Sequence, residues 1–159
     1  MTAELERPSR RIPAWLIKLI WRTHRAAHAI TGGRFGLRQP GPGRWGMLRL
    51  TTLGRRTGRT RVAILGYIED GPNLVTPAMN GWLAAEPAWL LNLQARPKAT
   101  VVLPTGETRS VVARAADPNE RRRLWGRLVD LGTAAYTDAN ARLRPRETTI
   151  VVLEPWSGD

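Results

Sequence analysis

The stretch 47 MLRLTTLGRRTGRTRVAILGYIE 69 contains two runs of alternating apolar and polar residues on either side of an arginine-rich segment. Alternation with a period of two is typical of strands with one buried face, so 47–53 and 61–69 are predicted to form a β-hairpin. The segment between the runs, with the start of the second run, carries four arginines and two glycines: Arg55, Arg56, Arg59, Arg61, Gly54 and Gly58. Crowded guanidinium groups repel one another, so this loop is either a solvated basic turn or a binding site for an anion.

The rest of the sequence predicts four further strands and two helices. The strands are 73–79, 99–103, 107–115 and 148–153, with hairpin-type turns before the first and third of them. One helix covers 87–95, and the other begins at the capping sequence Asp117-Pro-Asn-Glu and continues to about 131. This order favours an α+β fold, an antiparallel β-barrel of about six strands with flanking helices over its openings.

Composition and charge narrow the classes of function. The chain has 159 residues and no cysteine, so it is long enough for one domain and has no disulfide, catalytic thiolate or cysteine-ligated metal. Residues 1–61 hold fourteen Lys or Arg and only two Glu, whereas residues 62–159 hold eleven basic and eleven acidic residues. The whole formal excess of +12 therefore lies in the first part. Such asymmetry points to an anionic partner, which is a nucleic acid, a membrane surface or a phosphorylated ligand.

Residues 13–31 are predicted to form a basic amphipathic helix. One face is apolar, the opposite face is basic, and two tryptophans flank the boundary: Lys18, Arg22, Arg25, Trp15 and Trp21. Helices of this kind lie on anionic membrane surfaces, and the alternative is a helix that packs on its own domain. The basic residues interrupt the apolar run that an export signal or membrane span needs. His24 and His28 lie one turn apart, but no third ligand is present in the helix, so no metal site is predicted.

No catalytic constellation follows from the residues alone. Histidine is absent after residue 28, the carboxylates lie mostly in turns and caps, and no glycine-rich nucleotide pattern joins a strand to a helix. The protein therefore either only binds a ligand or relies on a cofactor for its chemistry. The guanidinium groups and the Thr57 hydroxyl suit a phosphate or carboxylate. A basic nucleic-acid-binding module is the less favoured alternative, because aromatic residues are not interleaved with the basic loop.

Four segments together carry a resemblance to a known family: 49 RLTTLGRRTGRTRV 62, 78 AMNG 81, 87 PAWLLNLQARPKATV 101 and 146 RETTIVVLEP 155. They resemble the deazaflavin-dependent nitroreductase family, also called the coenzyme F-420-dependent quinone reductases of actinobacteria. The resemblance implies a split β-barrel of the flavin-binding type, which agrees with the predicted strand order. It also implies coenzyme F-420, a deazaflavin that carries a phosphate and a polyglutamate tail, as the cofactor.

The resemblance also implies a set of cofactor-binding residues. Around the phosphate and tail it places Arg55, Arg56, Thr57 and Arg61. Beside the deazaflavin it places Val62, Ala78, Met79, Asn80, Gly81, Trp89 and Asn92, of which Asn92 also fixes the loop. The alternative is that Trp89 is an ordinary core residue and Asn92 an ordinary amide on the helix surface.

Several positions depart from the nitroreductase pattern. Met79 replaces a serine beside the deazaflavin, and of three tyrosines near the substrate only Tyr136 remains, with Thr133 and Ala139 at the other positions. Ala63 and Ile64 stand where the family has a proline and an asparagine. The resemblance therefore implies hydride transfer to a flat apolar acceptor such as a quinone, with Tyr136 as the catalytic candidate, either proton donor or pocket wall. The alternative is a coenzyme or lipid carrier without turnover.

These patterns predict the following division of the chain: a basic N-terminal helix and tail (1–31), a linker (32–46), the deazaflavin-binding barrel (47–155) and a C-terminal tail (156–159). The predicted location is the cytoplasm, with residues 13–31 docked on the inner face of the cell membrane, where quinones are dissolved. The sequence does not decide the oligomeric state.

Overall fold

The computed structural model describes residues 36–79, 85–132 and 147–158. The chain divides into two compact units, Met1–Phe35 and Gly36–Asp159, and the described residues belong to the second. The predicted helix at 13–31 therefore lies outside the described residues. The described part of the predicted linker belongs to the second unit, where Arg38 pairs with Met47 through an isolated β-bridge.

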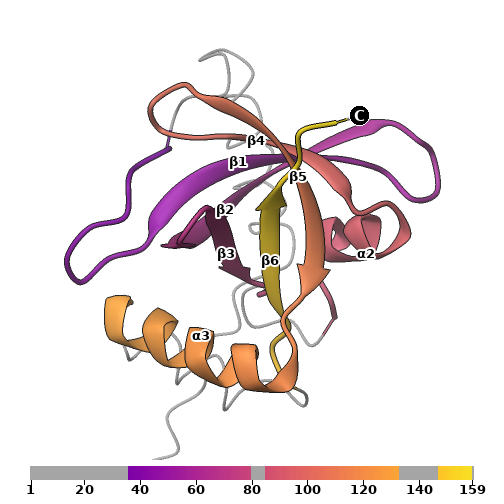
Figure 1. Cartoon of the computed structure of the whole chain (residues 1–159). Coiled ribbons are helices and arrows are strands. Elements are labelled where there is room, and N and C mark those ends of the chain that lie inside the picture. Colours follow the sequence, from indigo (N-terminus) through magenta and orange to yellow (C-terminus); the bar gives the residue numbers. More distant parts are fainter. Residues whose placement is uncertain (1–35, 80–84, 133–146, 159) are drawn as a thin grey trace, which may run out of the picture. The chain divides into compact units, whose positions relative to one another are not determined.

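Six antiparallel strands close into a barrel in the order β1-β2-β3-β6-β5-β4 (Figure 1). Each predicted strand is present, with its ends shifted by no more than two residues, so the predicted barrel is confirmed. The strands are β1 (Gly46–Leu53), β2 (Thr60–Asp70), β3 (Asn73–Pro77), β4 (Lys98–Val102), β5 (Thr108–Ala115) and β6 (Ile150–Pro155).

Every second residue of a strand points into the barrel, and these side chains fill its interior. Leu48 and Leu50 of β1 have no exposed surface, and Leu65 of β2 lies opposite Leu48 in the ladder. The helix α2 (Ala88–Ala95) adds three residues to the same core cluster, Trp89, Leu90 and Leu93. This helix therefore covers one opening of the barrel, as predicted.

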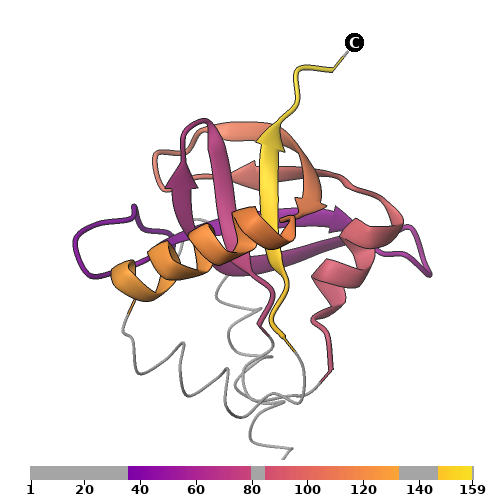
Figure 2. The ribbon, with the colours of Figure 1, turned by 60° about the horizontal axis from the view of Figure 1, so that its bottom comes forward.

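The helix α3 (Pro118–Leu131) packs on the outer wall of the barrel. The Asp117 carboxylate caps it by accepting hydrogen bonds from the backbone N–H groups of Asn119 and Glu120, both at 2.9 Å. Leu124 and Leu128 then pack against outward residues of β2, β3 and β6, which are Ile68, Val75, Ile150 and Val152. The prediction that both helices cover openings is wrong for α3, because these strands have apolar residues on both faces and need a cover outside the barrel (Figure 2). No helix in the described ranges is long and apolar enough to span a bilayer.

Two arginines of α3 bind one carboxylate at the turn between β2 and β3. Arg123 donates two hydrogen bonds to Asp70, at 2.9 and 2.8 Å, and Arg127 donates a further one. The Arg127 guanidinium also donates to the backbone carbonyl of Glu69 at 2.8 Å. The hydrogen bonds from Arg123, which outweigh the opposing effect of burial, lower the pKa of Asp70 below its ordinary value of 3.8.

This cluster makes stability depend on acid. Because the pKa of Asp70 is lower in the folded than in the unfolded chain, its stabilising effect is present above about pH 4 and is lost as the pH falls through the lowered pKa. We expect Asp70→Asn to melt below the wild type near pH 6, and the gap to narrow as the pH falls below about 4 and through the lowered pKa. Thermal unfolding of both proteins over this range measures the gap. A gap that stays constant with pH would show that Asp70 acts only through neutral hydrogen bonds.

Candidate functional site

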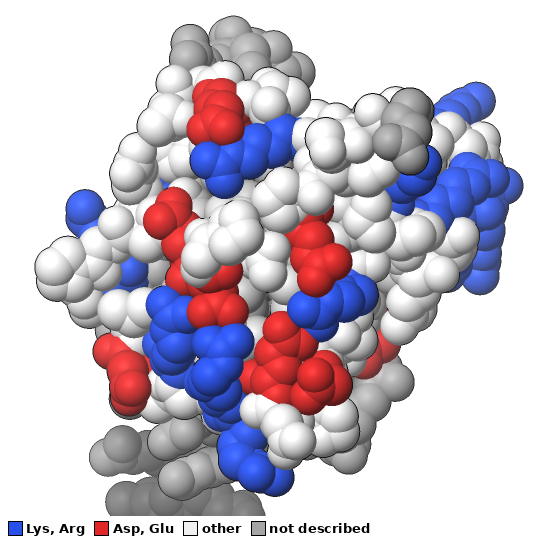
Figure 3. All heavy atoms as spheres, viewed as in Figure 1, with Lys and Arg blue, Asp and Glu red and all other residues white. Residues whose placement is uncertain are grey.

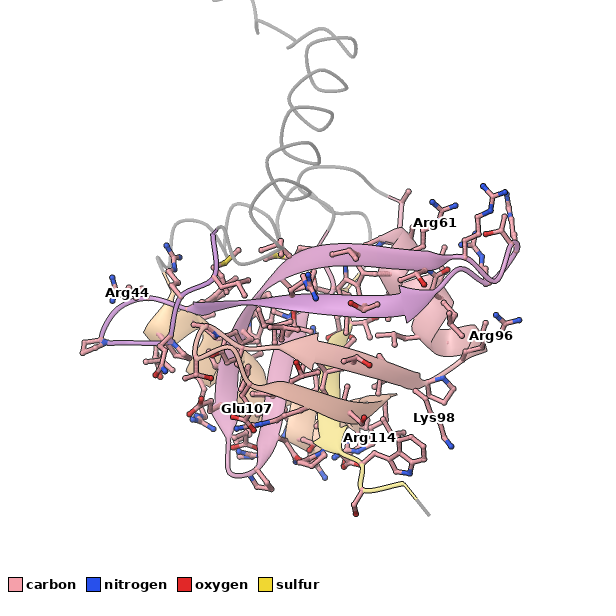
Figure 4. All side chains as sticks on the ribbon, turned by 90° about the horizontal axis from the view of Figure 1, so that it is seen from above. Arg44, Arg61, Arg96, Lys98, Glu107 and Arg114 are labelled. Carbon is pink, nitrogen blue, oxygen red and sulfur yellow. The ribbon has the colours of Figure 1, made fainter. Side chains whose placement is uncertain are left out.

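The loop between β1 and β2 has a defined backbone conformation. The Gly54 N–H donates to the Arg59 carbonyl at 2.8 Å, and the Gly58 N–H donates to the Gly54 carbonyl at 2.7 Å. Gly58 has φ +66°, which a residue with a Cβ adopts only with strain. The Thr57 hydroxyl accepts from the Arg59 N–H at 3.4 Å. The loop is therefore a closed turn that presents its side chains at the tip of the hairpin (Figure 4).

A buried amide of α2 fixes this loop to the barrel. The Asn92 side chain is 4% exposed, and its Oδ1 accepts a hydrogen bond from the Arg55 N–H at 3.0 Å. Its Nδ2 donates to the Thr52 hydroxyl, which is also buried, at 3.2 Å. Both ends of the amide are thus used, one on β1 and one on the loop. Asn92 is therefore not an ordinary surface amide, and it holds the loop in one position.

The loop arginines are exposed and have no acidic partner among the described residues. Arg55, Arg56, Arg59 and Arg61 take part in none of the ion pairs in the described ranges, which involve carboxylates elsewhere on the barrel. Arg96, which follows α2, adds a further cation beside the loop. Its Nη1 would lie 3.9 Å from a Cβ atom if Gly58 carried one. Figure 4 shows Arg61 and Arg96 at the same end of the barrel, and Figure 3 shows basic side chains gathered at the corresponding edge. This arrangement suits an anionic group.

The outer face of β2 leads from the loop to an apolar pocket. Val62 and Ile64 point outward along the strand, and Val62 is 55% exposed. Ile64 lines the pocket, which has a volume of about 410 Å³. At 3.3 Å per residue, Ile64 lies about 10 Å along the strand from Arg61. The pocket is lined mainly by apolar side chains, with two arginines: Trp45, Met47, Ile64, Leu65, Pro77, Met79, Arg38 and Arg44.

Trp45 forms a fixed wall of this pocket. Its indole N–H donates to the backbone carbonyl of Leu128 in α3 at 2.8 Å. Two glycines make room for the ring, because a Cβ on Gly66 or on Gly132 would lie 2.8 Å from a Trp45 atom. Sequence reasoning missed Trp45, although a tryptophan directly before the first strand was an available signal.

The structure brings some of the predicted cofactor residues together and separates others. Met79 lines the pocket, and Ala78 is fully buried directly before it. Trp89 is 8% exposed and belongs to the core cluster of the barrel. Its predicted place beside the deazaflavin stays a prediction. The predicted residues Asn80, Gly81 and Tyr136 lie outside the described residues.

The other tyrosine of the chain, Tyr67, is 1% exposed inside the barrel. Burial, with a smaller effect of the nearby Glu69 carboxylate, raises the pKa of Tyr67 to about 12. A phenol with so high a pKa holds its proton at neutral pH, and this one lies in the core rather than in the pocket lining. Tyr67 is therefore not a suitable proton donor for a ligand in the pocket.

Comparison with solved structures gives the fold class. The chain is similar to a structure described as an F420-H2 dependent reductase, FDR-A, with a TM-score of 0.60 and 22% identity over 68% of this chain and 93% of that chain. It is also similar to a structure described as a domain-swapped dimer, with a TM-score of 0.64 and 20% identity over 86% of this chain and 99% of the other. The described barrel is therefore of the split-barrel class.

Sequence comparison gives the family. The profile of the family described as F420H(2)-dependent quinone reductase matches residues 20–155, and the chain belongs to this family. A relative from Mycobacterium tuberculosis (strain ATCC 25618 / H37Rv), named "Putative F420H(2)-dependent quinone reductase Rv3178", is 33% identical over 122 residues, which are 76% of this chain and 95% of the relative. The protein is thus an F420-dependent reductase, and reduced coenzyme F-420 is its cofactor.

The described residues fit this cofactor. Its phosphate needs exposed cationic donors, and the loop arginines provide them without competition from described carboxylates. Its flat ring system needs an apolar cleft of a few hundred cubic ångströms, and the pocket of about 410 Å³ provides one.

Proposed function

We propose that the protein transfers a hydride from reduced coenzyme F-420 to a quinone in the pocket beside β2. The observation that carries this proposal is the connection of two features along one strand. The loop arginines lie at the start of β2, and the apolar pocket on the outer face of this strand begins about 10 Å further along it. A ligand with an anionic group and a flat ring spans that distance.

Each described part of the chain has a separate task in this proposal. Arg55, Arg56 and Arg61, with the Thr57 hydroxyl, bind the phosphate and acidic tail of the cofactor. Asn92 keeps the loop in position, so that less conformational entropy is lost on binding. The walls of the pocket, of which Trp45 is fixed by α3, orient the ring and exclude water.

The chemistry itself belongs to the cofactor, which when bound supplies a hydride from its ring carbon C5. Reduction of a quinone to its hydroquinone consumes that hydride and one proton. Tyr136 is proposed to donate the proton or to form a wall of the pocket. Met79, in place of a serine, makes the pocket more apolar, which favours a flat quinone over a nitro compound as the acceptor.

The experiment that tests this function is an anaerobic assay of the reduced coenzyme against a panel of quinones and nitroaromatic compounds. We expect the absorbance of the oxidised coenzyme to appear with quinones, and more slowly with nitro compounds. If the coenzyme binds but no acceptor oxidises it, the protein carries the coenzyme and does not reduce these quinones or nitroaromatic compounds. An equal or faster reaction with nitro compounds would contradict the role given to Met79.

We also propose that residues 13–31 bring the enzyme to the anionic inner face of the cell membrane, where quinones are dissolved. A basic residue near such a surface contributes about 1 kcal/mol of attraction, and this segment carries three, Lys18, Arg22 and Arg25. We expect the full chain to float with anionic liposomes at low salt and a chain lacking residues 1–31 not to float. Failure of the full chain to float, or unfolding of the shortened chain, would show that the segment serves the fold instead.

A further inference from the structure

The ladder that joins β2 to β3 in the closed barrel is short. The ladder between these strands ends at the pair Ile68 and Val75. If the ladder continued in the same register, Thr76 would pair with Tyr67, but this pair does not form. On its other side, Thr76 is paired with Val151 of β6. The strands therefore diverge at Thr76. The apolar pocket lies at this divergence, because its lining includes Leu65 and Gly66 from β2 and Thr76 and Pro77 from β3.

Thr76 places a hydroxyl without a partner at this point. The residue is 1% exposed, and its Oγ1 is buried without a hydrogen-bond partner. Thr52, another buried strand threonine, accepts a hydrogen bond from Asn92. A buried hydroxyl that lacks a partner destabilises the folded chain, and valine, which has the same shape, avoids this penalty. The fold alone therefore does not account for a threonine at this position.

We propose that Thr76 is a ligand-binding residue whose hydroxyl donates a hydrogen bond to a carbonyl oxygen on the edge of a flat ring held in the pocket. This proposal rests on the proposed function. The deazaflavin ring and a quinone both carry ring carbonyl groups, so either one is a possible source of this oxygen. Rotation about χ1 between staggered positions turns the hydroxyl within the pocket wall.

The surroundings of Thr76 give this hydrogen bond a role in orientation. Most of the described lining is apolar, and Trp45, Ile64 and Met79 contact a flat ring without fixing its rotation in its own plane. Among the described residues of the lining, Thr76 is the only one whose side chain carries a hydroxyl group. A single donor in an apolar pocket selects the orientation in which a ring carbonyl faces it. Thr76 therefore determines which edge of the ring points towards the gap between β2 and β3.

The test compares Thr76→Val, which removes the hydroxyl, with Thr76→Ser, which keeps it and removes the methyl group. Melting temperatures are measured without ligand, and dissociation constants are measured by fluorescence titration with oxidised coenzyme F-420. We expect the valine variant to melt at or above the wild type and the serine variant to melt below it. We expect ligand binding to follow the opposite order, with serine close to the wild type and valine weaker by about fivefold. A purely structural role does not produce opposite orders.

Two measurements show whether the carbonyl belongs to the coenzyme or to the acceptor. If the hydroxyl binds the cofactor ring, Thr76→Val weakens the titration with coenzyme alone. If it binds the acceptor, the titration is unchanged and KM for the quinone rises about fivefold.

Thr100→Val, on the outer face of β4 and away from the pocket, is the matched control and should change neither constant. Should the valine variant not fold, Thr76→Ser and Thr76→Ala, which differ only by the hydroxyl, repeat the comparison.

Two results would contradict a ligand-binding role for the Thr76 hydroxyl. If Thr76→Val leaves both constants unchanged, the hydroxyl binds neither ring. If it lowers melting temperature and binding together while serine restores both, the hydroxyl serves the fold. Failure of the proposed function itself looks different. In that case the wild type binds neither coenzyme nor quinone, whereas failure of the Thr76 proposal leaves wild-type binding intact.

Discussion

Replacing both Arg55 and Arg56 with alanine is expected to weaken the binding of coenzyme F-420 about hundredfold or more. A hydrogen bond to a charged group contributes about 1.5–3 kcal/mol, and each 1.4 kcal/mol is about a tenfold change in the dissociation constant. The melting temperature should hardly change, because neither side chain forms an ion pair within the described ranges. Fluorescence titration of the oxidised coenzyme at fixed salt measures the effect.

A matched control separates local binding from the total charge. Arg122 is exposed on α3, and Arg122→Glu changes the net charge by the same amount as the double replacement in the loop. We expect this variant to bind the coenzyme as the wild type does. Equal weakening by both changes would mean that the coenzyme responds to the overall positive charge, and the loop would then not be its binding site.

Replacement of Asn92 by leucine is expected to lower both stability and coenzyme binding. Leucine has a similar size but leaves the Arg55 N–H and the Thr52 hydroxyl without their partner. An unsatisfied buried polar group costs about 1–3 kcal/mol, so the free energy of unfolding should fall by about 2 kcal/mol or more. Coenzyme binding should weaken about tenfold, because the loop loses its attachment to α2. Chemical denaturation and coenzyme titration measure the two effects.

A double-mutant cycle with Thr52→Val shows whether the effect passes through this contact. Residues in one hydrogen-bond network have coupled effects, so the double variant should be more stable than the sum of the single changes implies. Gln94→Ala removes an exposed amide from the same helix and should change neither property. Strict additivity of the Asn92 and Thr52 changes, or normal coenzyme binding by Asn92→Leu, would contradict the role of Asn92 in holding the loop.

The parts of the fold with a local signal were predictable from the sequence. The alternation in 47–53 and 61–69 predicted the β1–β2 hairpin because each strand has one buried face. The capping residue Asp117 predicted the start of α3. The loop arginines were candidates because their crowding is a property of the sequence itself. The split-barrel class and the cofactor came instead from the resemblance of four segments to a known family.

Features that depend on contacts between distant residues were not predictable. The amide of Asn92 meets Arg55 and Thr52 only after the barrel has closed, 37 and 40 residues away along the chain. Trp45 becomes a pocket wall through a hydrogen bond to Leu128, 83 residues away. The position of α3 on the outer wall depends on which strands are apolar on both faces, and that follows from the order of strands in the barrel.

A crystal structure of the full chain with oxidised coenzyme F-420 tests the central claim most directly, namely that one ligand spans the arginine loop and the pocket along β2. We expect the phosphate within hydrogen-bond distance, about 3 Å, of donors from Arg55, Arg56 or Thr57. The deazaflavin ring should lie in the pocket against Ile64 and Met79. A coenzyme whose phosphate is bound away from the loop, or whose ring lies outside this pocket, would contradict the claim.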